Sequence, residues 1–383
     1  EASPGGSTTA RTARCVGQHY HYGGRLEACS ASPRPSILRR TRKAQLVQQR
    51  QILNLAPLAF CVISLMPCPN AAAQIHIDIV PNKTKDVAPF KLFVDASGTT
   101  AAEVEDAWAF HDLHYVWDFG DPSSGTWATN GKSRNSGFGA TYGHVFDRPG
   151  KYTVTLTVSN PLTGDTATDS FSINVEDPGK CFAGENTICV SPNGDFSGAP
   201  GGALLVTDND FASAIDTYAK SGKRVLFRRG EQWRISRSPA RIVEDGPSVI
   251  GAFGKGPKPK LVAEVGCGAI LSFSEMKRNV TKNWRVMDLE IDGNWVETAT
   301  AIRLCGHDQL VYRVDCSRVN GGISFSESGL RFQWDKGQRP LLNSDLGIVD
   351  CTVSNIGKPS PGGGVGIYGA TDGILLLGST LHD

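Results

Sequence analysis

The chain has 383 residues, which leaves room for two ordinary domains, and its 43 glycines beside a charged fraction of 20% favour turn-rich β structure over helical bundles. The formal net charge of +1 conceals an uneven distribution, because residues 1–73 hold 9 of the 39 basic residues and only 2 of the 38 acidic ones. Residues 74–383 therefore carry a net charge of −6, which excludes the basic surface of a nucleic-acid-binding protein.

Residues 1–73 have the pattern of a leader that is removed during export. Basic residues cluster within 39–50, an apolar run covers 52–66, and three alanines ending at Ala73 supply the small residues of a signal-peptidase site. Pro57 interrupts the apolar run, which is also short for a membrane span, so a retained anchor is the less favoured alternative. We expect cleavage near Ala73 and a protein that is secreted or held at the cell surface without spanning the membrane.

Residues 74–177 contain two runs that alternate apolar and polar side chains. Tyr115–Asp121 reads Tyr-Val-Trp-Asp-Phe-Gly-Asp, and the run that begins at Pro149 reads Pro-Gly-Lys-Tyr-Thr-Val-Thr-Leu-Thr-Val-Ser. Period two is the pattern of a strand with one face on a core and one in water. These motifs resemble the PKD family of immunoglobulin-like domains over about residues 75–177. The resemblance implies a β-sandwich in which Trp117 and Phe119 are buried.

Two carboxylates of this region are candidate metal ligands. Asp118 and Asp121 could cap the turn that follows the first strand or bind calcium, whose hard oxygen ligands they would supply. We favour capping because the dense ligand spacing of a calcium loop is absent, and no other cofactor is predicted. The segment 122–141 is a long surface loop, and its Trp127 could stack on a sugar ring or fold back on the sandwich.

A boundary is predicted at residues 176–180, where Pro and Gly end the last strand. Beyond it, a helical pattern with Phe211, Ile215 and Tyr218 on one face begins at a cap formed by Thr207 or Asp208. A strand and a glycine turn follow at 224–230. This order resembles the beginning of right-handed parallel β-helix proteins of the pectate-lyase-like class. The predicted fold is therefore all-β, with an immunoglobulin-like sandwich at 74–177 and an incomplete parallel β-helix at 178–383.

Weak internal repeats support the β-helix. Val349–Asn355 aligns with Leu377–Asp383 at 28 residues, Val314–Asn320 lies 35 residues earlier, and Val286–Asp292 lies another 28 before that. We expect coils that stack apolar side chains and place Asn or Asp at the bends. In this alignment Cys316 and Cys351 occupy equivalent positions, and Arg318 introduces a slip of one residue.

The ends of the chain lead to a further expectation. Residues 377–383 have the pattern of the middle of a coil, without the cap that a solenoid needs. No methionine precedes Met66, and the first forty or so residues show no periodic pattern. We therefore expect the protein to be truncated at both ends, with its natural start near Leu46 or Val47.

Six cysteines follow the leader, and an exported protein can oxidise them. Cys181 and Cys189 flank a short turn and form the most plausible disulfide, although connectivity does not follow from sequence. Cys305, Cys316 and Cys351 lie in apolar runs and are expected to be buried. No zinc-binding spacing occurs.

The sequence leaves three functions open. The first is a secreted lyase, epimerase or hydrolase acting on polysaccharide, in which the coils place a cation and a base on their outer face. The second is non-catalytic adhesion or binding to a cell-surface glycan. The third is a structural role, with the sandwich, which has 7 basic and 14 acidic residues over 74–177, contacting other surface proteins. For each candidate side chain we favour a structural or solvated role. The candidate catalytic residues are Arg303, His307, Asp308, Arg313 and Asp315, with Arg331 and Asp335 later in the chain.

Overall fold

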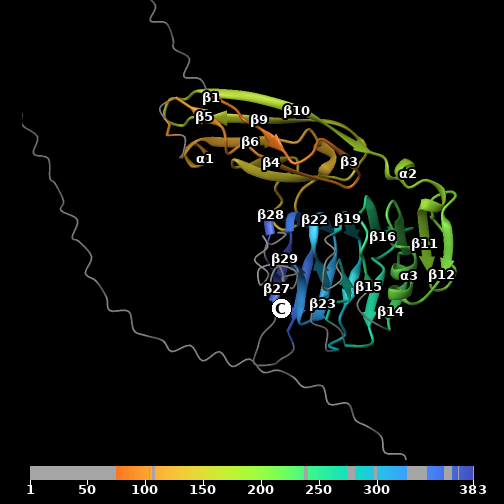
Figure 1. Cartoon of the computed structure of the whole chain (residues 1–383). Helices are drawn as coiled ribbons and strands as arrows, with labels where there is room; N and C mark the ends of the chain where they lie inside the picture. The colour runs from red at the N-terminus through yellow and green to blue at the C-terminus, as the bar shows by residue number, and fades with distance from the viewer. Residues whose placement is uncertain are drawn as a thin grey trace, which may run out of the picture. The chain divides into compact units, whose positions relative to one another are not determined.

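The computed structural model describes residues 75–102, 104–105, 108–236, 240–266, 268–273, 281–296, 300–325, 343–357, 365–369 and 371–382. Residues 67–383 form one compact unit. Its described part holds a β-sandwich, coloured orange to yellow-green in Figure 1, and a parallel β-helix, coloured green to blue. The predicted all-β fold is confirmed. No helix of the described residues is long and apolar enough to cross a membrane.

The sandwich is built from three small sheets. Its longest pairing is antiparallel, between β9 and β10. The five-stranded sheet has the order β3 (Lys85–Val87), β10 (Thr166–Glu176), β9 (Gly150–Ser159), β6 (His114–Asp118) and β7 (Ser136–Phe138). The others are β2 (Val80–Pro81), β4 (Phe90–Asp95) and β8 (Thr141–Phe146), and the pair β1 (Ile75–His76) and β5 (Thr100–Ala101), with α1 (Ala109–Asp112) and η2 (Pro122–Ser124) in the connections.

The period-two pattern produces the sandwich core as predicted. Trp117 and Phe119 are fully buried, and Val154, Leu156 and Val158 of the neighbouring strand β9 are buried in the same core. The Trp117 indole N–H donates a hydrogen bond to the Gly139 carbonyl at 2.9 Å, so the polar edge of the ring is also satisfied. Trp117 is therefore a packing residue and is not available to a ligand.

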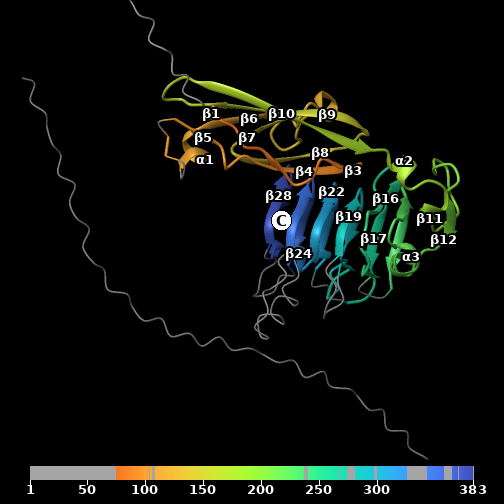
Figure 2. The same ribbon diagram turned by 45° about the horizontal axis from the view of Figure 1, so that its top comes forward.

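The β-helix consists of three parallel sheets, and after the first two strands of the eight-stranded sheet successive strands enter the three sheets in turn. Figure 2 shows the strands of successive coils side by side. The eight-stranded sheet has the order β12 (Leu204–Thr207), β11 (Thr187–Ser191), β13 (Arg224–Arg228), β16 (Ser248–Phe253), β19 (Thr281–Met287), β22 (Gly306–Tyr312), β25 (Asn343–Val349) and β28 (Thr371–Leu377). The six-stranded sheet contains β14 (Gln232–Ile235), β17 (Lys260–Ala263), β20 (Glu290–Asp292), β23 (Asp315–Val319), β26 (Thr352–Ile356) and β29 (Thr380–His382). The five-stranded sheet contains β15 (Ala240–Arg241), β18 (Leu271–Ser272), β21 (Ile302–Leu304), β24 (Gly321–Phe325) and β27 (Val365–Tyr368).

Short helices lead from the sandwich into the first coil. They are α2 (Pro178–Cys181), η3 (Gly184–Asn186) and α3 (Phe211–Tyr218). The α3 cap is Asp210, whose carboxylate accepts the Ser213 N–H at 2.9 Å, so the predicted cap at Thr207 or Asp208 was wrong. Asp208 instead accepts the N–H of Asp210 itself at 2.9 Å.

The interior of the coils is a continuous apolar column. Val225, Ile250, Val286, Val311 and Ile348 are neighbours in register on successive strands of the eight-stranded sheet and belong to one buried cluster. Each coil buries its apolar side chains against the coils before and after it, which is the main source of stability in a solenoid.

Two columns of left-handed residues bend the coils. Asp288, Arg313, Asp350 and Gly378 follow four neighbouring strands of the eight-stranded sheet and have φ between 53° and 59°. The second column runs through the strands themselves and contains Asn283, Asp308, Asp345 and Gly373. Asn, Asp and Gly tolerate this conformation better than other residues. Of the bends predicted from the repeats, Asn355 has a positive φ, whereas Asp292 lies in β20 and Asn320 has no positive φ.

The register corrects part of the repeat alignment. Val349 pairs with Leu377 of the next coil, as the 28-residue repeat predicted. In the preceding coil the partner of Val349 is Tyr312 and not the predicted Val314. The partner of Val286 is likewise Val311 and not Val314. The alignment was wrong there because the connecting segments differ in length from coil to coil. Arg318 introduces no slip, because the pairs on either side of it keep one register and its counterpart in the next coil, Asn355, is also left-handed.

The cysteine expectations also change. Cys316 pairs with Val353, whereas Cys351 lies in the preceding turn, so the two thiols are not equivalent. Cys181 and Cys189 are free thiols, and the predicted disulfide is absent. Cys181 is exposed, while Cys189 is buried in β11 against Leu226 and Phe253. Cys267 lies outside the described residues.

The left-handed turn at Asn355 yields a stability prediction. Asn355 is exposed and has φ of 48°. We expect Asn355→Val to lower the free energy of unfolding by about 1–2 kcal/mol, because a β-branched residue is strained there. Asn355→Gly should be nearly neutral, and Ser354→Val, one residue earlier on the same strand, is the control. Equal stability of the Val and Gly variants in urea unfolding would contradict this account.

Candidate functional site

The five catalytic candidates lie on three different faces of the β-helix. His307 and Asp308 belong to β22 and Arg313 follows it directly, so these three lie on the eight-stranded sheet. Arg303 is in β21 of the five-stranded sheet, and Asp315 begins β23 of the six-stranded sheet. The strands therefore do not bring the set together. Arg331 and Asp335 lie outside the described residues.

Asp308 contacts the sandwich. Its carboxylate forms ion pairs with Lys83 at 2.6 Å and with Lys91 of β4 at 3.2 Å. Lys83 also pairs with Asp86 at 2.5 Å. The Lys91 side chain is only 2% exposed, and its ammonium group also donates to the Asp345 carbonyl in the next coil. Asp308 thus joins two lysines that precede it by more than 200 residues.

Arg285 of β19 extends this cluster. Its guanidinium pairs with Asp86 at 2.8 Å and donates to the Pro89 carbonyl at 2.9 Å, and it is 3% exposed. Burial alone would raise the pKa of Asp86, but the charges of Arg285 and Lys83 hold it below its usual range. Burial lowers the pKa of Lys91 to about 8, and the charge of Asp308 only partly opposes this shift.

Arg313 is the centre of a second cluster. Its guanidinium lies 4.0 Å from the centre of the Tyr312 ring, binds both oxygens of Asp288 at 2.7 and 3.1 Å, and pairs with Asp147 of the sandwich at 2.9 Å. The Tyr312 hydroxyl donates to Asp147 at 2.8 Å and accepts from Arg134 at 2.7 Å. Burial raises the pKa of Tyr312, and burial acts against the charged form of Arg313 as well, but its bonds to Asp288 raise the Arg313 pKa overall.

Apolar contacts fill the space between the charged clusters. The cluster contains Trp127 and Val145 of the sandwich with Leu310, Tyr312, Val349 and Leu375 of the β-helix. Trp127 is 7% exposed and is packed so closely on Gly378 that a Cβ at that glycine would overlap the indole. The outer surface of β19, β22, β25 and β28 is called the covered face below, and the set of contacts between the covered face and the sandwich is called the seam. Trp127 belongs to the seam, so neither of the two predicted placements, on sugar or on its own sandwich, is correct.

Two glycines allow the close approach at the covered face. A Cβ at Gly347 of β25 would lie 2.7 Å from Cδ of Lys91, and a Cβ at Gly143 of β8 would lie 2.6 Å from a methyl carbon of Leu375. Real Cβ atoms do not approach other atoms this closely. Both positions therefore need glycine for contact, and neither residue has the positive φ that would otherwise explain it.

The other candidates have local partners. His307 shares a hydrogen bond of 2.8 Å with the Ser344 hydroxyl, and Asp315 pairs with Lys258 at 2.8 Å. Arg303 donates to the Gly268 carbonyl at 3.0 Å. Each of these three candidates therefore has a polar partner within the β-helix.

The candidate metal ligands belong to a turn network. Asp118 accepts hydrogen bonds from the Gly120 N–H and from the Asn135 side chain, both at 2.8 Å. Asp121 accepts from the Ser123 hydroxyl at 3.0 Å and contacts the buried His144 at 3.1 Å. Within the described ranges, no group of three or more His, Cys, Asp or Glu side chains is placed to hold a metal ion. The geometry is that of turn capping.

The five-stranded sheet carries a row of polar residues that sequence reasoning recognised only in part. Arg241, Ser272, Arg303 and Ser324 are neighbours in register on β15, β18, β21 and β24, and we call them the arginine row. Their strand neighbours Ala240, Leu271, Ile302 and Ile323 face the buried interior, so the row points away from it. Arg241 is exposed and Arg303 is half-buried, whereas Ser272 and Ser324 are buried. Among the described residues, the Ser324 hydroxyl has no hydrogen-bond partner.

Several functional positions gave weak signals in the sequence. Lys91 lies in the run Phe90–Val94, where a lysine between apolar residues would be expected to face water, and yet both faces of β4 are largely buried. Arg241 and Arg303 could not be related, because 62 residues separate them and the lengths of the coils vary.

The depressed pKa of Lys91 gives a pH prediction. Its pKa falls from 10.5 to about 8 on folding, so between these values the unfolded chain binds more protons and stability rises with pH. Below pH 8 Lys91 is charged in both the folded and the unfolded state, so the folded state bears the full cost of burying the ammonium group. Relative to Lys91→Met, the wild type should gain up to about 3 kcal/mol between pH 7.5 and 10.5, measured by urea unfolding. Parallel pH profiles would contradict this, and exposed Lys151→Met is the control.

Comparison with known proteins identifies the sandwich. Residues 93–172, about a fifth of the chain, match the family model described as PKD domain. The match begins in β4 and ends in β10, and the resemblance predicted from the Trp-Asp-Phe-Gly-Asp motif is confirmed. None of the curated proteins compared with the chain matches it. PKD domains typically occur in extracellular proteins. Because of the family match, the sandwich of this chain is assigned as a PKD domain, a module that suggests an extracellular accessory role.

Proposed function

We propose that the protein is secreted or displayed at the cell surface and binds acidic polysaccharide on the β-helix, with the PKD domain as an accessory module fixed to the covered face. The observation that carries this proposal is the arginine row. Neighbouring strands lie about 4.8 Å apart, so the backbones of Arg241 and Arg303, two strands apart, are separated by about 10 Å. Two guanidinium groups at this separation suit two carboxylates along an extended polymer.

Ser272 and Ser324 are on strands that alternate with those of the two arginines. Both serines are only 2% exposed, so the two arginines are the groups of the row that a polymer would contact.

The positions of the acids and bases favour binding over catalysis. A uronate lyase or epimerase needs a cation and a base beside the same sugar. Arg303 could serve as the cation, but His307, Asp308 and Asp315 lie on the other two sheets. Asp308 is also fully engaged by Lys83 and Lys91. We therefore place non-catalytic adhesion to glycan ahead of lyase or epimerase activity.

The proposal is tested with the Arg241→Ala/Arg303→Ala double variant. We expect its affinity for polygalacturonate or alginate to fall at least tenfold relative to wild type, since hydrogen bonds to charged groups contribute about 1.5–3 kcal/mol each. Binding is measured by affinity electrophoresis at low and moderate salt, with a neutral glucan as reference. Arg148→Ala/Lys151→Ala on the sandwich is the charge-matched control.

Two results would contradict the proposal. The first is equal retention of the arginine-row variant and the control variant. The second is release of unsaturated uronate products, detected by their ultraviolet absorbance, which would show that the protein is a lyase. Retention with no product is the expected result.

A further inference from the structure

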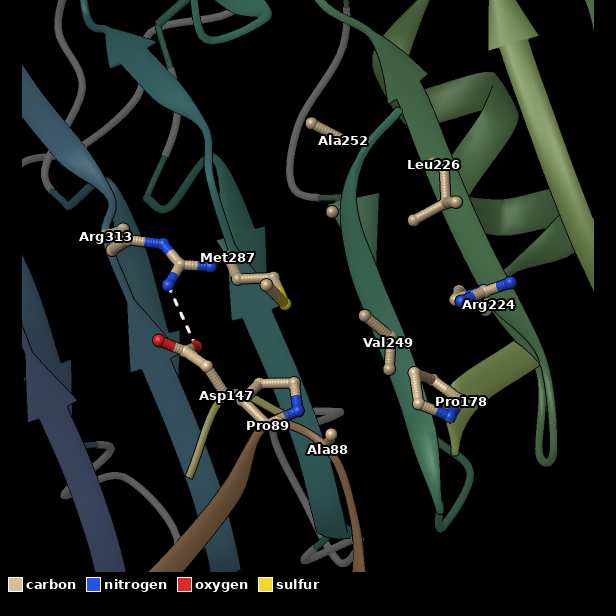
Figure 3. Close-up of a pocket in the computed structure, with 11 residues that line it drawn as sticks. Ala88, Pro89, Asp147, Pro178, Arg224, Leu226, Val249, Ala252, Met287 and Arg313 are labelled. Atoms are coloured by element: carbon tan, nitrogen blue, oxygen red, sulfur yellow. Dashed lines mark hydrogen bonds and ion pairs between the residues drawn. The ribbon is translucent and has the colours of Figure 1, made fainter. Parts of the chain in front are cut away.

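A cavity lies between the sandwich and the β-helix, away from the arginine row. Its volume is about 350 Å³, which is within the range of small-ligand sites. Ala88, Pro89 and Asp147 of the sandwich line one side, and residues of β13, β16 and β19 line the other (Figure 3). Arg313 and Asp147 form the ion pair at one end, and Arg224 lies at the other end, beside Val249 and Pro178.

The two arginines of the cavity differ in how their charge is compensated. Arg313 is neutralised by Asp288 and Asp147. Arg224 donates twice to the Thr187 hydroxyl, at 3.1 and 2.9 Å, and lies 5.8 Å from the centre of the Phe182 ring. Across the described part of the chain, no carboxylate forms an ion pair with Arg224.

Partial burial makes this uncompensated charge costly. Arg224 is half-buried, and burial lowers its pKa, which the charge of Asp177 opposes only in part. Cations that are removed from water are ordinarily paired with an anion. The contrast with Arg313 therefore makes Arg224 the group of this cavity that is available to pair with a bound anion.

The floor of the cavity is apolar. Leu226, Val249 and Met287 line it, with Pro89 opposite. Gly251 keeps it open, because a Cβ there would lie 3.2 Å from Cγ of Met287 and 3.4 Å from a methyl carbon of Leu226. A ligand that fits must combine one anionic group with a compact body that has a less polar face.

We propose that this cavity binds a small organic carboxylate of the size of a single uronic acid. Its carboxylate would pair with Arg224, and the less polar face of its ring would lie on Leu226 and Met287. This site is independent of the arginine row and does not rest on the proposed polymer binding. Because the sandwich and the β-helix both contribute to its walls, the ligand would also strengthen their attachment.

The site is tested by calorimetric titration of the full chain with galacturonate. We expect binding to the wild type and at least tenfold weaker binding to Arg224→Met, which keeps the apolar stem but removes the charge. Exposed Arg234→Met on β14 is the matched control and should bind like wild type. Galactose, which has the same ring without the carboxylate, should not bind.

A second variant keeps the test decisive if Arg224→Met fails to fold. Gly251→Val leaves Arg224 in place and fills the cavity, so it should also abolish binding, while the double variant of the arginine row should still bind galacturonate. Circular dichroism checks the fold of each variant. Wild-type affinity in folded Gly251→Val or Arg224→Met, or equal affinity for galactose and galacturonate, would overturn the proposal.

Discussion

The salt bridge of Asp308 with Lys83 and Lys91 is the interaction on which the arrangement of the molecule depends. Lys91 is buried, so removal of Asp308 would leave its ammonium group without a compensating charge. The sandwich therefore has one favourable position on the β-helix, in which Asp308 meets both lysines and Arg285 meets Asp86. Apolar contacts such as Trp127 on Gly378 add area to this seam, but they are less selective for position.

Occupation of the covered face limits where the β-helix can meet a ligand. The eight-stranded sheet offers its longest strands, but between β19 and β28 its outer side chains contact the sandwich. Two outer faces are left. The six-stranded sheet carries ion pairs such as Lys260 with Glu290, in which the charges satisfy each other. The five-stranded sheet presents Arg241 and Arg303 on alternate strands and is the better surface for an acidic ligand.

The sequence predicted what local patterns encode. Alternation around Trp117 predicted the sandwich core, because period two is a property of neighbouring residues. The 28-residue repeat related Val349 to Leu377, where the connecting segment has the length assumed, and failed at Val314, where it does not. Asp308 and Arg313 were recognised as unusual, but their partners Lys83 and Asp147 are 225 and 166 residues away. No local pattern identifies such partners, so the contacts of Asp308 and Arg313 with the sandwich could not be predicted.

Gly143 and Gly347 have a consequence for how this protein can be recombined. Each glycine on one side of the seam accommodates a side chain from the other, Leu375 in the first case and Lys91 in the second. A PKD domain with a larger residue at the position of Gly143 would overlap Leu375 of this β-helix as well as the Leu92 carbonyl of its own β4. The sandwich therefore cannot be exchanged freely for another PKD domain, because its surface is complementary to this β-helix. A chimera would have to transfer both glycines and the Asp308 ion pairs together.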